Sequence, residues 1–284
     1  MHATMADPID WYPARILQPR ADRDEGSNTP VRPNQFALII LNQPLRDVST
    51  LKTLWKNSSL RVAADGGANR LLDVCQNDDG SSVFDNLDAI IGDLDSLTTQ
   101  ARQHFTTRAK PAKIVHDPDQ YSTDFGKAVK WIRASATPSP EAGAGAAPPD
   151  IVAMGGLGGR VDQGLSQLHH LYLFQTSPSY AEGRLFLVSG ESITFLLKPG
   201  KHRIHVRERD GNGERRGDVF DKYAGIVPVK QPSVITLRGF EWDVTDWETE
   251  FGGQMSTSNH VLPETEAVEV ETTKEVLFTI ALKR

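Results

Sequence analysis

The chain has 284 residues, of which 38% are hydrophobic, and a formal net charge of -6. This hydrophobic content supports a folded core of one large or two ordinary domains and excludes a disordered chain. The acidic balance argues against nucleic acid or a membrane as partner. A single cysteine, Cys75, suits a reducing compartment, and no stretch resembles a signal peptide or a bilayer-spanning segment, so we expect a cytoplasmic protein.

Residues 1–34 carry several Pro, Asp and Arg residues with little periodicity, and we interpret them as an N-terminal extension with Trp11 and Tyr12 as candidates for docking on the body. The pattern then changes to apolar runs that alternate with stretches of helical spacing. The runs lie at 36–41, 60–64, 89–91, 113–115 and 151–154. This alternation predicts an α/β domain over 35–181 with a mostly parallel sheet.

The second of these runs leads directly into Asp-Gly-Gly-Ala-Asn-Arg at 65–70. Gly66 and Gly67 allow the backbone to approach a ligand closely, and the start of the following helix favours anions. An ordinary strand-to-helix turn also uses Asp-Gly-Gly, so this stretch leaves both interpretations open.

The third run ends in Gly-Asp-Leu-Asp-Ser at 92–96, which brings two carboxylates into one loop. Ligands of open α/β sheets bind beyond the carboxyl ends of the strands, where this loop is expected to lie. Asp93 and Asp95 are oxygen ligands of the type that Mg²⁺ prefers and shares with substrate phosphates. The alternative is that Asp95 and Ser96 only cap the next helix.

Two further predicted strand ends are polar. The fourth leads into a stretch rich in acids at 116–124, and Asp124 falls near a helix start, where a carboxylate is stabilised with or without metal. The fifth opens into Gly-Gly-Leu-Gly-Gly-Arg-Val-Asp-Gln at 155–163, which matches neither a dinucleotide fingerprint nor a P-loop. Packed glycines beside Arg160 still suit a phosphate. The adjacent His169 and His170 point different ways on a helix, so we interpret them as surface or core residues.

From residue 182 onward the chain is rich in short strands, and we predict an all-β sandwich domain over 182–284 that follows the α/β domain. Trp242 could serve as a core anchor, which is the usual role of a tryptophan in a sandwich. The polar run at 256–259 is interpreted as a capping turn. The stretches at 134–150 and 207–222 are predicted to be loop insertions without site residues.

Taken together, these motifs resemble those of the eukaryotic thiamine pyrophosphokinases, specifically of the fungal kind. The resemblance runs from about residue 36 to the C-terminus. It rests on seven motifs in family order, at 65–70, 92–96, 118–125, 155–163, 197–203, 225–229 and 256–259. The family transfers the terminal diphosphate of ATP to the hydroxyl of thiamine and releases AMP. Its members are homodimers with an α/β domain, a β-sandwich domain and active sites at the subunit cleft.

The resemblance also implies roles for individual residues. Asp93, Asp95 and Asp124 match the family's Mg²⁺ ligands, with Asp65 close by, and we expect these four acids and Arg160 to be catalytic. The expected binding residues for ATP and thiamine lie in both halves of the chain. They are Gly66, Gly67, Ser96, Gln120, Thr123, Gly158, Gly159, Arg160, Asp162, Gln163, Trp242, Ser256, Ser258 and Asn259.

These residues would support in-line attack on ATP, helped by charge neutralisation and by the placement of the reactants. Asp124 and Asp65 are both candidates to accept the hydroxyl proton, and the sequence does not choose between them. A tryptophan face and an acidic cleft suit cationic thiamine. The alternatives are another metal-dependent transferase, such as a nucleotide-sugar glycosyltransferase, and a non-catalytic thiamine or nucleotide sensor.

Overall fold

The computed structural model describes residues 7–19, 36–77, 82–136, 148–209 and 216–284. The chain divides into two compact units. One comprises Pro30–Gly190, here called the α/β unit, and the other combines Met1–Thr29 with Glu191–Arg284, here called the β unit. Most of the predicted insertion at 134–150, the centre of that at 207–222 and much of the extension at 1–34 lie outside the described residues. The expected α/β part and β-rich part of the chain are both confirmed.

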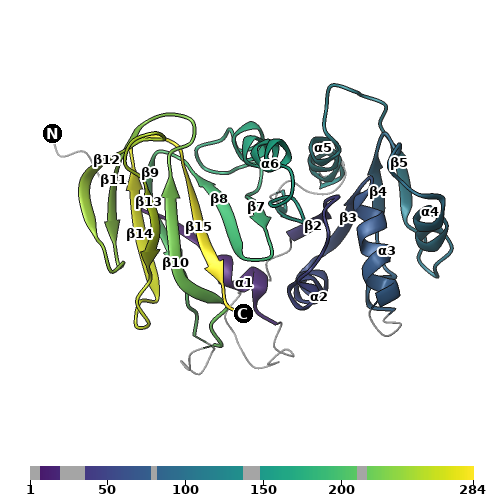
Figure 1. The fold of residues 1–284 in the computed structure, drawn as a ribbon, viewed down its shortest axis with the longest axis horizontal. Helices are drawn as coiled ribbons and strands as arrows, with labels where there is room; N and C mark the ends of the chain where they lie inside the picture. Colours follow the sequence, from purple (N-terminus) through teal and green to yellow (C-terminus); the bar gives the residue numbers. More distant parts are fainter. Residues whose placement is uncertain (1–6, 20–35, 78–81, 137–147, 210–215) are drawn as a thin grey trace, which may run out of the picture. The chain divides into compact units, whose positions relative to one another are not determined.

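The α/β unit contains a sheet whose strands pair only in parallel (Figure 1). Its spatial order is β7-β6-β2-β3-β4-β5. The strands are β2 (Phe36–Ile40), β3 (Leu60–Ala64), β4 (Ala89–Gly92), β5 (Lys113–His116), β6 (Asp150–Met154) and β7 (Leu185–Val188). The chain moves outward from β2 to β5 and then returns to β6 on the other side of β2. The strand order therefore reverses between β2 and β6, which is where an open α/β sheet binds its ligands.

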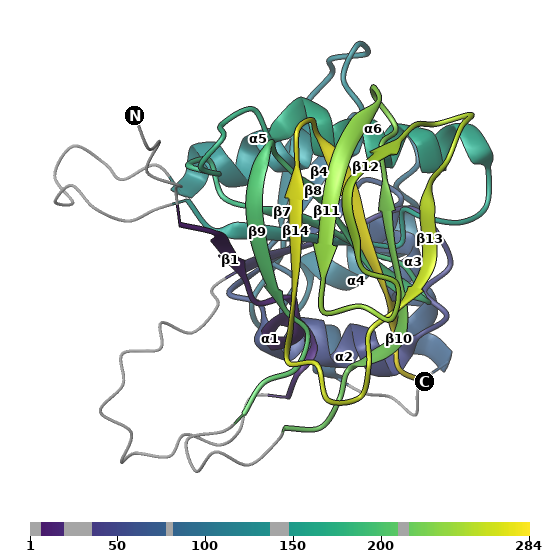
Figure 2. The same ribbon diagram turned by 90° about the vertical axis from the view of Figure 1, so that its left-hand side faces the viewer.

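Burial explains why these strands read as continuous apolar runs. All five residues of β2 are buried, as are all four of β4, because helices cover both faces of a parallel sheet. The helices are α2 (Val48–Asn57), α3 (Gly67–Asn77), α4 (Thr99–Thr106), α5 (Asp124–Ala136) and α6 (Val161–Phe174), with a short 3₁₀ turn at Ser82–Phe84. Figures 1 and 2 show α5 and α6 on one side of the sheet and α2 on the other.

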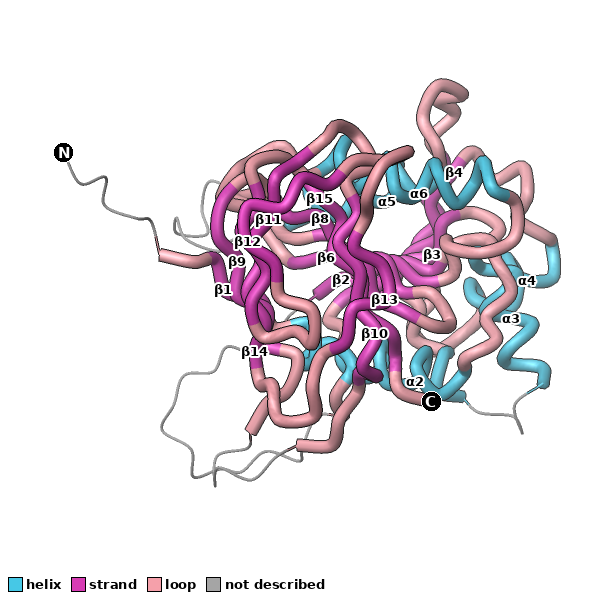
Figure 3. Tube along the Cα trace, turned by 60° about the vertical axis from the view of Figure 1, so that its left-hand side comes forward, coloured by secondary structure: helices cyan, strands magenta, loops and turns pink. Residues whose placement is uncertain are grey.

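The β unit is built from two sheets (Figure 3). One holds β13 (Ser256–His260), β10 (Phe220–Val227), β15 (Val276–Leu282) and β8 (Ser192–Leu197), in that order and antiparallel. The other holds β1 (Ile9–Trp11), β9 (Gly200–His205), β14 (Ala267–Thr272), β11 (Ser233–Arg238) and β12 (Val244–Thr249). The sandwich was predicted from residues 182–284 alone, but β1 from the N-terminal stretch pairs in parallel with β9 and makes this sheet mixed.

The residues that we interpreted as an extension contribute to the core of this unit. Trp11 is fully buried, its indole N–H donates to Nδ1 of His202 at 3.0 Å, and its ring stacks on Phe195 with centroids 4.5 Å apart. A short helix, α1 (Pro13–Leu17), follows β1. Because Trp11 fills the space between the two sheets, the segment at 9–17 is part of the folded β unit.

The 256–259 run differs from its interpretation as a capping turn. It forms β13, which pairs antiparallel with β10 and places Asn259 opposite Ala224. Only Asn259 of these four side chains is buried. An edge strand needs backbone pairing on one side only, so polar residues can form it without an apolar face.

Candidate functional site

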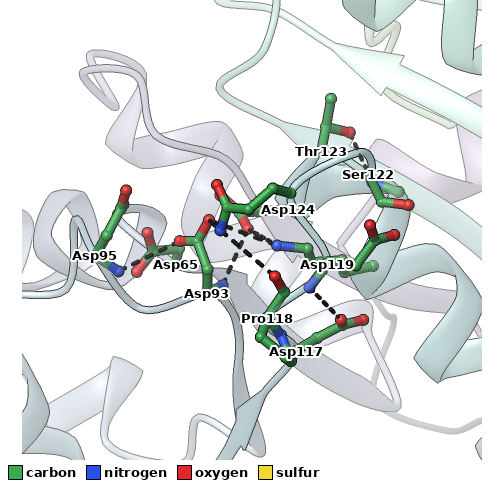
Figure 4. A network of polar contacts seen from close by, with 12 residues as sticks. Asp65, Asp93, Asp95, Asp117, Pro118, Asp119, Ser122, Thr123 and Asp124 are labelled. Atoms are coloured by element: carbon green, nitrogen blue, oxygen red, sulfur yellow. Dashed lines mark hydrogen bonds and ion pairs between the residues drawn. The ribbon is translucent and has the colours of Figure 1, made fainter.

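The site is assembled at the carboxyl ends of the parallel strands. Asp65 follows β3, Asp93 follows β4, and Asp124 opens helix α5 after β5. Figure 4 shows these carboxylates together with Asp95, turned toward one another. Asp65, Asp93 and Asp95 each offer an oxygen within 4.8 Å of the others, and we call them the acid cluster.

Asp65 is the buried member of the acid cluster, with only 1% of its surface exposed. Its Oδ2 accepts a hydrogen bond from the amide of Ser96 at 3.0 Å, while its Oδ1 has no hydrogen-bond partner among the described residues. Burial raises the pKa of Asp65 to about 6, and the negative charges of Asp124, Asp95 and Asp93 add to the rise. Its backbone adopts a positive φ of 40°, a conformation that is costly outside glycine. The buried Oδ1 of Asp65 is therefore free of protein hydrogen bonds among the described residues, a feature that is compatible with a ligand at this position.

Asp93 and Asp95 lie in a tight loop that is held both by an internal hydrogen bond and by a bond from Gln120. The amide of Asp95 donates to Oδ1 of Asp93 at 3.3 Å, and Gln120 Nε2 donates to Oδ2 of Asp93 at 3.2 Å. Burial opposes ionisation of Asp93, but the Asp95 amide and the positive charge of Lys127 outweigh it, so the pKa of Asp93 is lowered. Asp93 is therefore held as a carboxylate.

Lys127 also belongs to this site, although its role was not predicted from the sequence. Its side chain is only 1% exposed, and its Nζ lies 3.3 Å from Oδ1 of Asp124 and 3.6 Å from Oδ2 of Asp93. Burial disfavours the charged amine, but the two carboxylates outweigh this and raise the pKa of Lys127. A buried lysine is stable only when paired, so Lys127 supplies positive charge inside a site of four acids. The available signal was its position three residues after Asp124 on α5.

Asp124 is linked to the acid cluster through its neighbours. Its Oδ1 receives Lys127 and lies 3.4 Å from the amide of Asp93, and burial raises its pKa despite the lysine. The structure thus groups Asp65 with Asp93 and Asp95. Asp124 lies beside this cluster and forms an ion pair with Lys127. The residues fit a hard divalent cation, because they are carboxylates and one buried oxygen is unpartnered. The predicted Mg²⁺ ligand set of Asp93, Asp95 and Asp124 remains a prediction.

A cavity of about 280 Å³ lies at the point where the strand order reverses. Of the residues predicted for substrate binding, Thr123 and Gln163 line it, and Asp124 borders it. Asn42 and Gln167 also line it and were not predicted. Gln167 is 8% exposed, and its Oε1 has no hydrogen-bond partner among the described residues. Gln167 therefore combines a position at the cavity with a buried acceptor that has no protein partner among the described residues.

Glycines beside the site are required by close packing. A Cβ on Gly67 would lie 2.2 Å from the carbonyl oxygen of Ile40, and one on Gly66 would lie 2.3 Å from Nδ2 of Asn42. In the glycine loop, Gly158 and Gly159 have φ angles of 122° and 72°. The first two glycines thus have a packing role, which leaves their predicted ligand contact untested.

The Arg160 side chain is exposed and forms an ion pair with Asp162. It is the N-cap residue of α6, and its guanidinium forms two bonds to the carboxylate of Asp162, at 2.5 and 3.1 Å. Both side chains are mostly exposed. A phosphate that bound Arg160 would therefore compete with Asp162 for the same guanidinium.

The predicted thiamine-side residues lie in the β unit. Trp242 is 52% exposed, and its ring is tilted against His260 at 4.7 Å. Asn259 is buried and accepts hydrogen bonds from the amides of Trp242 and His260, and it donates to the carbonyl of Trp242 at 2.9 Å. Asn259 therefore fixes the backbone that carries Trp242. Ser258 is exposed with a φ of 56°, and Ser256 is half-buried.

Replacing Gly92 with alanine is expected to destabilise the α/β unit by about 1–3 kcal/mol. The new Cβ would lie 2.7 Å from Cβ of Asp65 and 2.8 Å from Oδ1 of Asp124, so one of the acids must move. Urea denaturation measures the effect. The matched control is Gly164→Ala on α6, where the added Cβ meets no atom within 4 Å and helix propensity favours alanine. Equal stability of the two variants would show that the acids are not packed tightly around Gly92.

None of the helices in the described part of the chain has the length and apolar character needed to cross a bilayer.

Acids, a buried lysine and a glycine loop at the carboxyl edge of a parallel sheet define a class of proteins that handle phosphorylated ligands. Family comparisons narrow this class. The thiamin pyrophosphokinase catalytic domain matches residues 51–180, and the thiamin pyrophosphokinase vitamin B1 binding domain matches residues 201–277. The chain belongs to the thiamine pyrophosphokinase family.

Thiamine pyrophosphokinases from several organisms are similar to this chain over most of its length. Thiamine pyrophosphokinase 1 of Arabidopsis thaliana is 32% identical over 259 residues, which cover 88% of this chain and 87% of that protein. Thiamine pyrophosphokinase of Saccharomyces cerevisiae is 28% identical over 269 residues, with 81% of each chain covered. The structure of thiamin pyrophosphokinase from Candida albicans superposes with a TM-score of 0.75 over 99% of this chain and 96% of that one, at 23% identity. This last likeness bears on the fold alone.

Proposed function

We propose that this chain is a thiamine diphosphokinase, which transfers the terminal diphosphate of ATP to the hydroxyl group of thiamine and yields thiamine diphosphate and AMP. The observation that carries the proposal is the acid cluster beside Lys127 and the cavity at the strand-order reversal. The two family matches and the 32% identity to a plant thiamine pyrophosphokinase support it.

In the proposed reaction, Mg²⁺ held by Asp93, Asp95 and Asp124, with Asp65 adjacent, would act as a Lewis acid on the phosphates. The chain's own residues prepare the site. Lys127 bonds to Asp124 and lies near Asp93, so these carboxylates keep a fixed spacing although both are negatively charged. Amides of the glycine loop and Arg160 would bind phosphate oxygens and the departing AMP.

A proton must leave the thiamine hydroxyl during attack. Asp65 and Asp124 remain the two candidates to accept it, and both have raised pKa values caused first by burial. A carboxylate whose pKa lies nearer to neutrality is a better base for this step. Burial raises the pKa of Asp65 to about 6, and its Oδ1 has no hydrogen-bond partner among the described residues.

Coupled measurement of AMP release with ATP, Mg²⁺ and thiamine tests the proposed function. We expect AMP only when all three are present. Release of a nucleoside diphosphate from a nucleotide sugar would favour the glycosyltransferase alternative. Binding of both ligands in calorimetry without any turnover would favour a sensor.

Trp242→Ala is expected to raise the KM for thiamine by about tenfold or more, with little change in the KM for ATP. The half-exposed indole offers a face to a cationic ring, and its backbone is held by Asn259. Initial-rate kinetics with each substrate varied in turn measure both constants. Trp247→Ala, on the exposed edge strand β12, is the matched control. Equal changes in both KM values would indicate a structural role for Trp242.

We further propose a cytoplasmic homodimer with active sites at the subunit cleft, in which Trp242 of one subunit serves the site of the other, and with no nucleic-acid or membrane partner. The net charge of -6 supports the last point. Light scattering coupled to size exclusion tests the dimer, which should have twice the 31.3 kDa mass of the chain. Membership of the fungal kind stays a proposal. The superposition on the Candida albicans structure covers 96% of that chain, whereas the plant relatives reach 32% sequence identity.

A further inference from the structure

His170 connects helix α6 to the start of helix α5. It is 3% exposed, and its Nε2 lies 2.7 Å from Oγ1 of Thr123, the residue just before α5. Its other ring nitrogen, Nδ1, lies 2.5 Å from the carbonyl oxygen of Ser166, one turn earlier on α6. Both nitrogens of this buried imidazole are therefore occupied by oxygen atoms whose hydrogen-bonding roles can be assigned.

The Ser166 carbonyl can only accept a hydrogen bond, so Nδ1 of His170 must carry a proton. Burial lowers the pKa of His170, which favours the neutral ring. In a neutral ring with a proton on Nδ1, Nε2 has none and can only accept. The Thr123 hydroxyl must then donate its proton to His170.

This assignment determines what Thr123 can offer to a ligand. Its Oγ1 already accepts a hydrogen bond from the amide of Gly126 at 3.1 Å, which caps the first turn of α5. With its proton directed at His170, the hydroxyl has one lone pair left. Thr123 is exposed and lines the cavity next to Asp124, so a hydrogen-bond donor that enters this cavity can use the lone pair.

The surroundings of the ring hold it in this orientation. The ring centroid of His170 lies 4.8 Å from that of Phe125 and 5.8 Å from that of Phe174, with the Phe174 ring stacked. These contacts come from both helices that the histidine joins. Its neighbour His169 is exposed, and its ring lies edge-on to that of His170 with the centroids 5.7 Å apart.

We propose that His170 is a positioning residue: it fixes the Thr123 hydroxyl as a hydrogen-bond acceptor for an N–H or O–H group of a substrate in the cavity beside Asp124. The inference rests on the proposed function only for the identity of that substrate. The tautomer of His170 and its bond to Thr123 are properties of the free chain and can be tested without any assay of activity.

Nitrogen NMR of the ¹⁵N-histidine-labelled full chain at pH 7.5 tests the assignment directly, with His170→Gln used to identify the signals among the eight histidines. The expected result is a neutral ring protonated on Nδ1 and unprotonated on Nε2. A ring protonated on Nε2, or on both nitrogens, would overturn the proposal. The tautomer is read from the wild-type chain, and His170→Phe identifies the same signals if His170→Gln folds poorly. Failure of the thiamine assay would not change it.

Kinetics of three variants then test whether the bond matters for turnover. His170→Phe keeps the ring packing but removes the acceptor, and we expect kcat to fall by about tenfold. His170→Gln retains an acceptor and should recover most of this loss, while the matched control His169→Phe should behave as the wild type.

Double-mutant analysis with Thr123→Val separates positioning from general packing. Because both changes remove the same hydrogen bond, His170→Phe should have little further effect on kcat in the Thr123→Val background. Fully additive losses, or equal losses for the Phe and Gln variants at position 170, would show that His170 acts only through packing.

Discussion

Replacing Asp95 with alanine is expected to lower the rate of AMP release by about 10²–10³-fold or more while the chain stays folded. Asp95 lies in an exposed loop, and its carboxylate completes the acid cluster with Asp65 and Asp93. Its removal takes away one oxygen ligand of the proposed cation without opening the core. The coupled AMP assay measures the rate, and circular dichroism checks the fold.

The matched control for this variant is Asp73→Ala. Asp73 is an exposed acid on α3 that pairs with Arg70 at 3.6 Å, and it is not part of the acid cluster. The control removes the same charge from the same unit and should leave turnover unchanged. Near-normal turnover of Asp95→Ala would remove the acid cluster from the mechanism.

Replacing Asp65 with asparagine is expected to stabilise the metal-free chain by about 2–3 kcal/mol at pH 7–8. Burial raises the pKa of Asp65 to about 6 from 3.8, so ionisation of this residue disfavours the folded state. Asparagine has no charge to bury, and its carbonyl can still accept from the Ser96 amide. The expected gain is large because an unneutralised carboxylate is buried here.

The stability difference between Asp65→Asn and the wild type should increase with pH. At a pH well below 3.8, Asp65 is protonated in both the folded and the unfolded chain, and it costs no stability. As the pH rises through the folded pKa of about 6, the unfolded chain is ionised while the folded chain resists ionisation, so the wild type loses stability. The advantage of Asp65→Asn should therefore be small at pH 4 and complete above about pH 7.

Urea denaturation in EDTA at a series of pH values measures the difference between the two proteins. The matched control, Asp73→Asn, removes an exposed acid from α3 and should change stability by less than about 0.5 kcal/mol. A variant at position 65 that is no more stable than the wild type at pH 8 would contradict the burial of an ionised carboxylate.

The sequence predicted the α/β unit well because its strands have a strong and local signal. The run at 60–64 corresponds to β3 with identical bounds, and that at 151–154 differs from β6 by one residue. The strands β2, β3, β4 and β6 are largely apolar, and turn residues follow closely after them, so their identity can be read from neighbouring residues.

The β unit was predicted less completely because several of its strands depend on distant partners. β1 consists of three residues that become a strand by pairing with β9, almost 200 positions later. β12 and β13 were not predicted, since they are polar edge strands whose alternation of buried and exposed residues is weak. Backbone pairing supplied by a remote strand leaves no local pattern in the sequence.

The same distinction applies to the site. Asp65 and Asp93 could be placed together because parallel strands deliver their carboxyl ends to one edge. The roles of Lys127 and His170 could not, because they depend on which helix face meets the acids and on single contacts between α5 and α6. A lysine and a histidine within helices have many ordinary surface roles, and only the fold distinguishes this pair.

The most direct test of this account is a ³¹P NMR time course of the full chain with ATP and thiamine, with and without Mg²⁺. AMP and thiamine diphosphate should accumulate in equal amounts, and only when Mg²⁺ is present. Formation of ADP or free phosphate in place of AMP, or equal turnover in EDTA, would contradict transfer of a diphosphate by a metal held at the acid cluster.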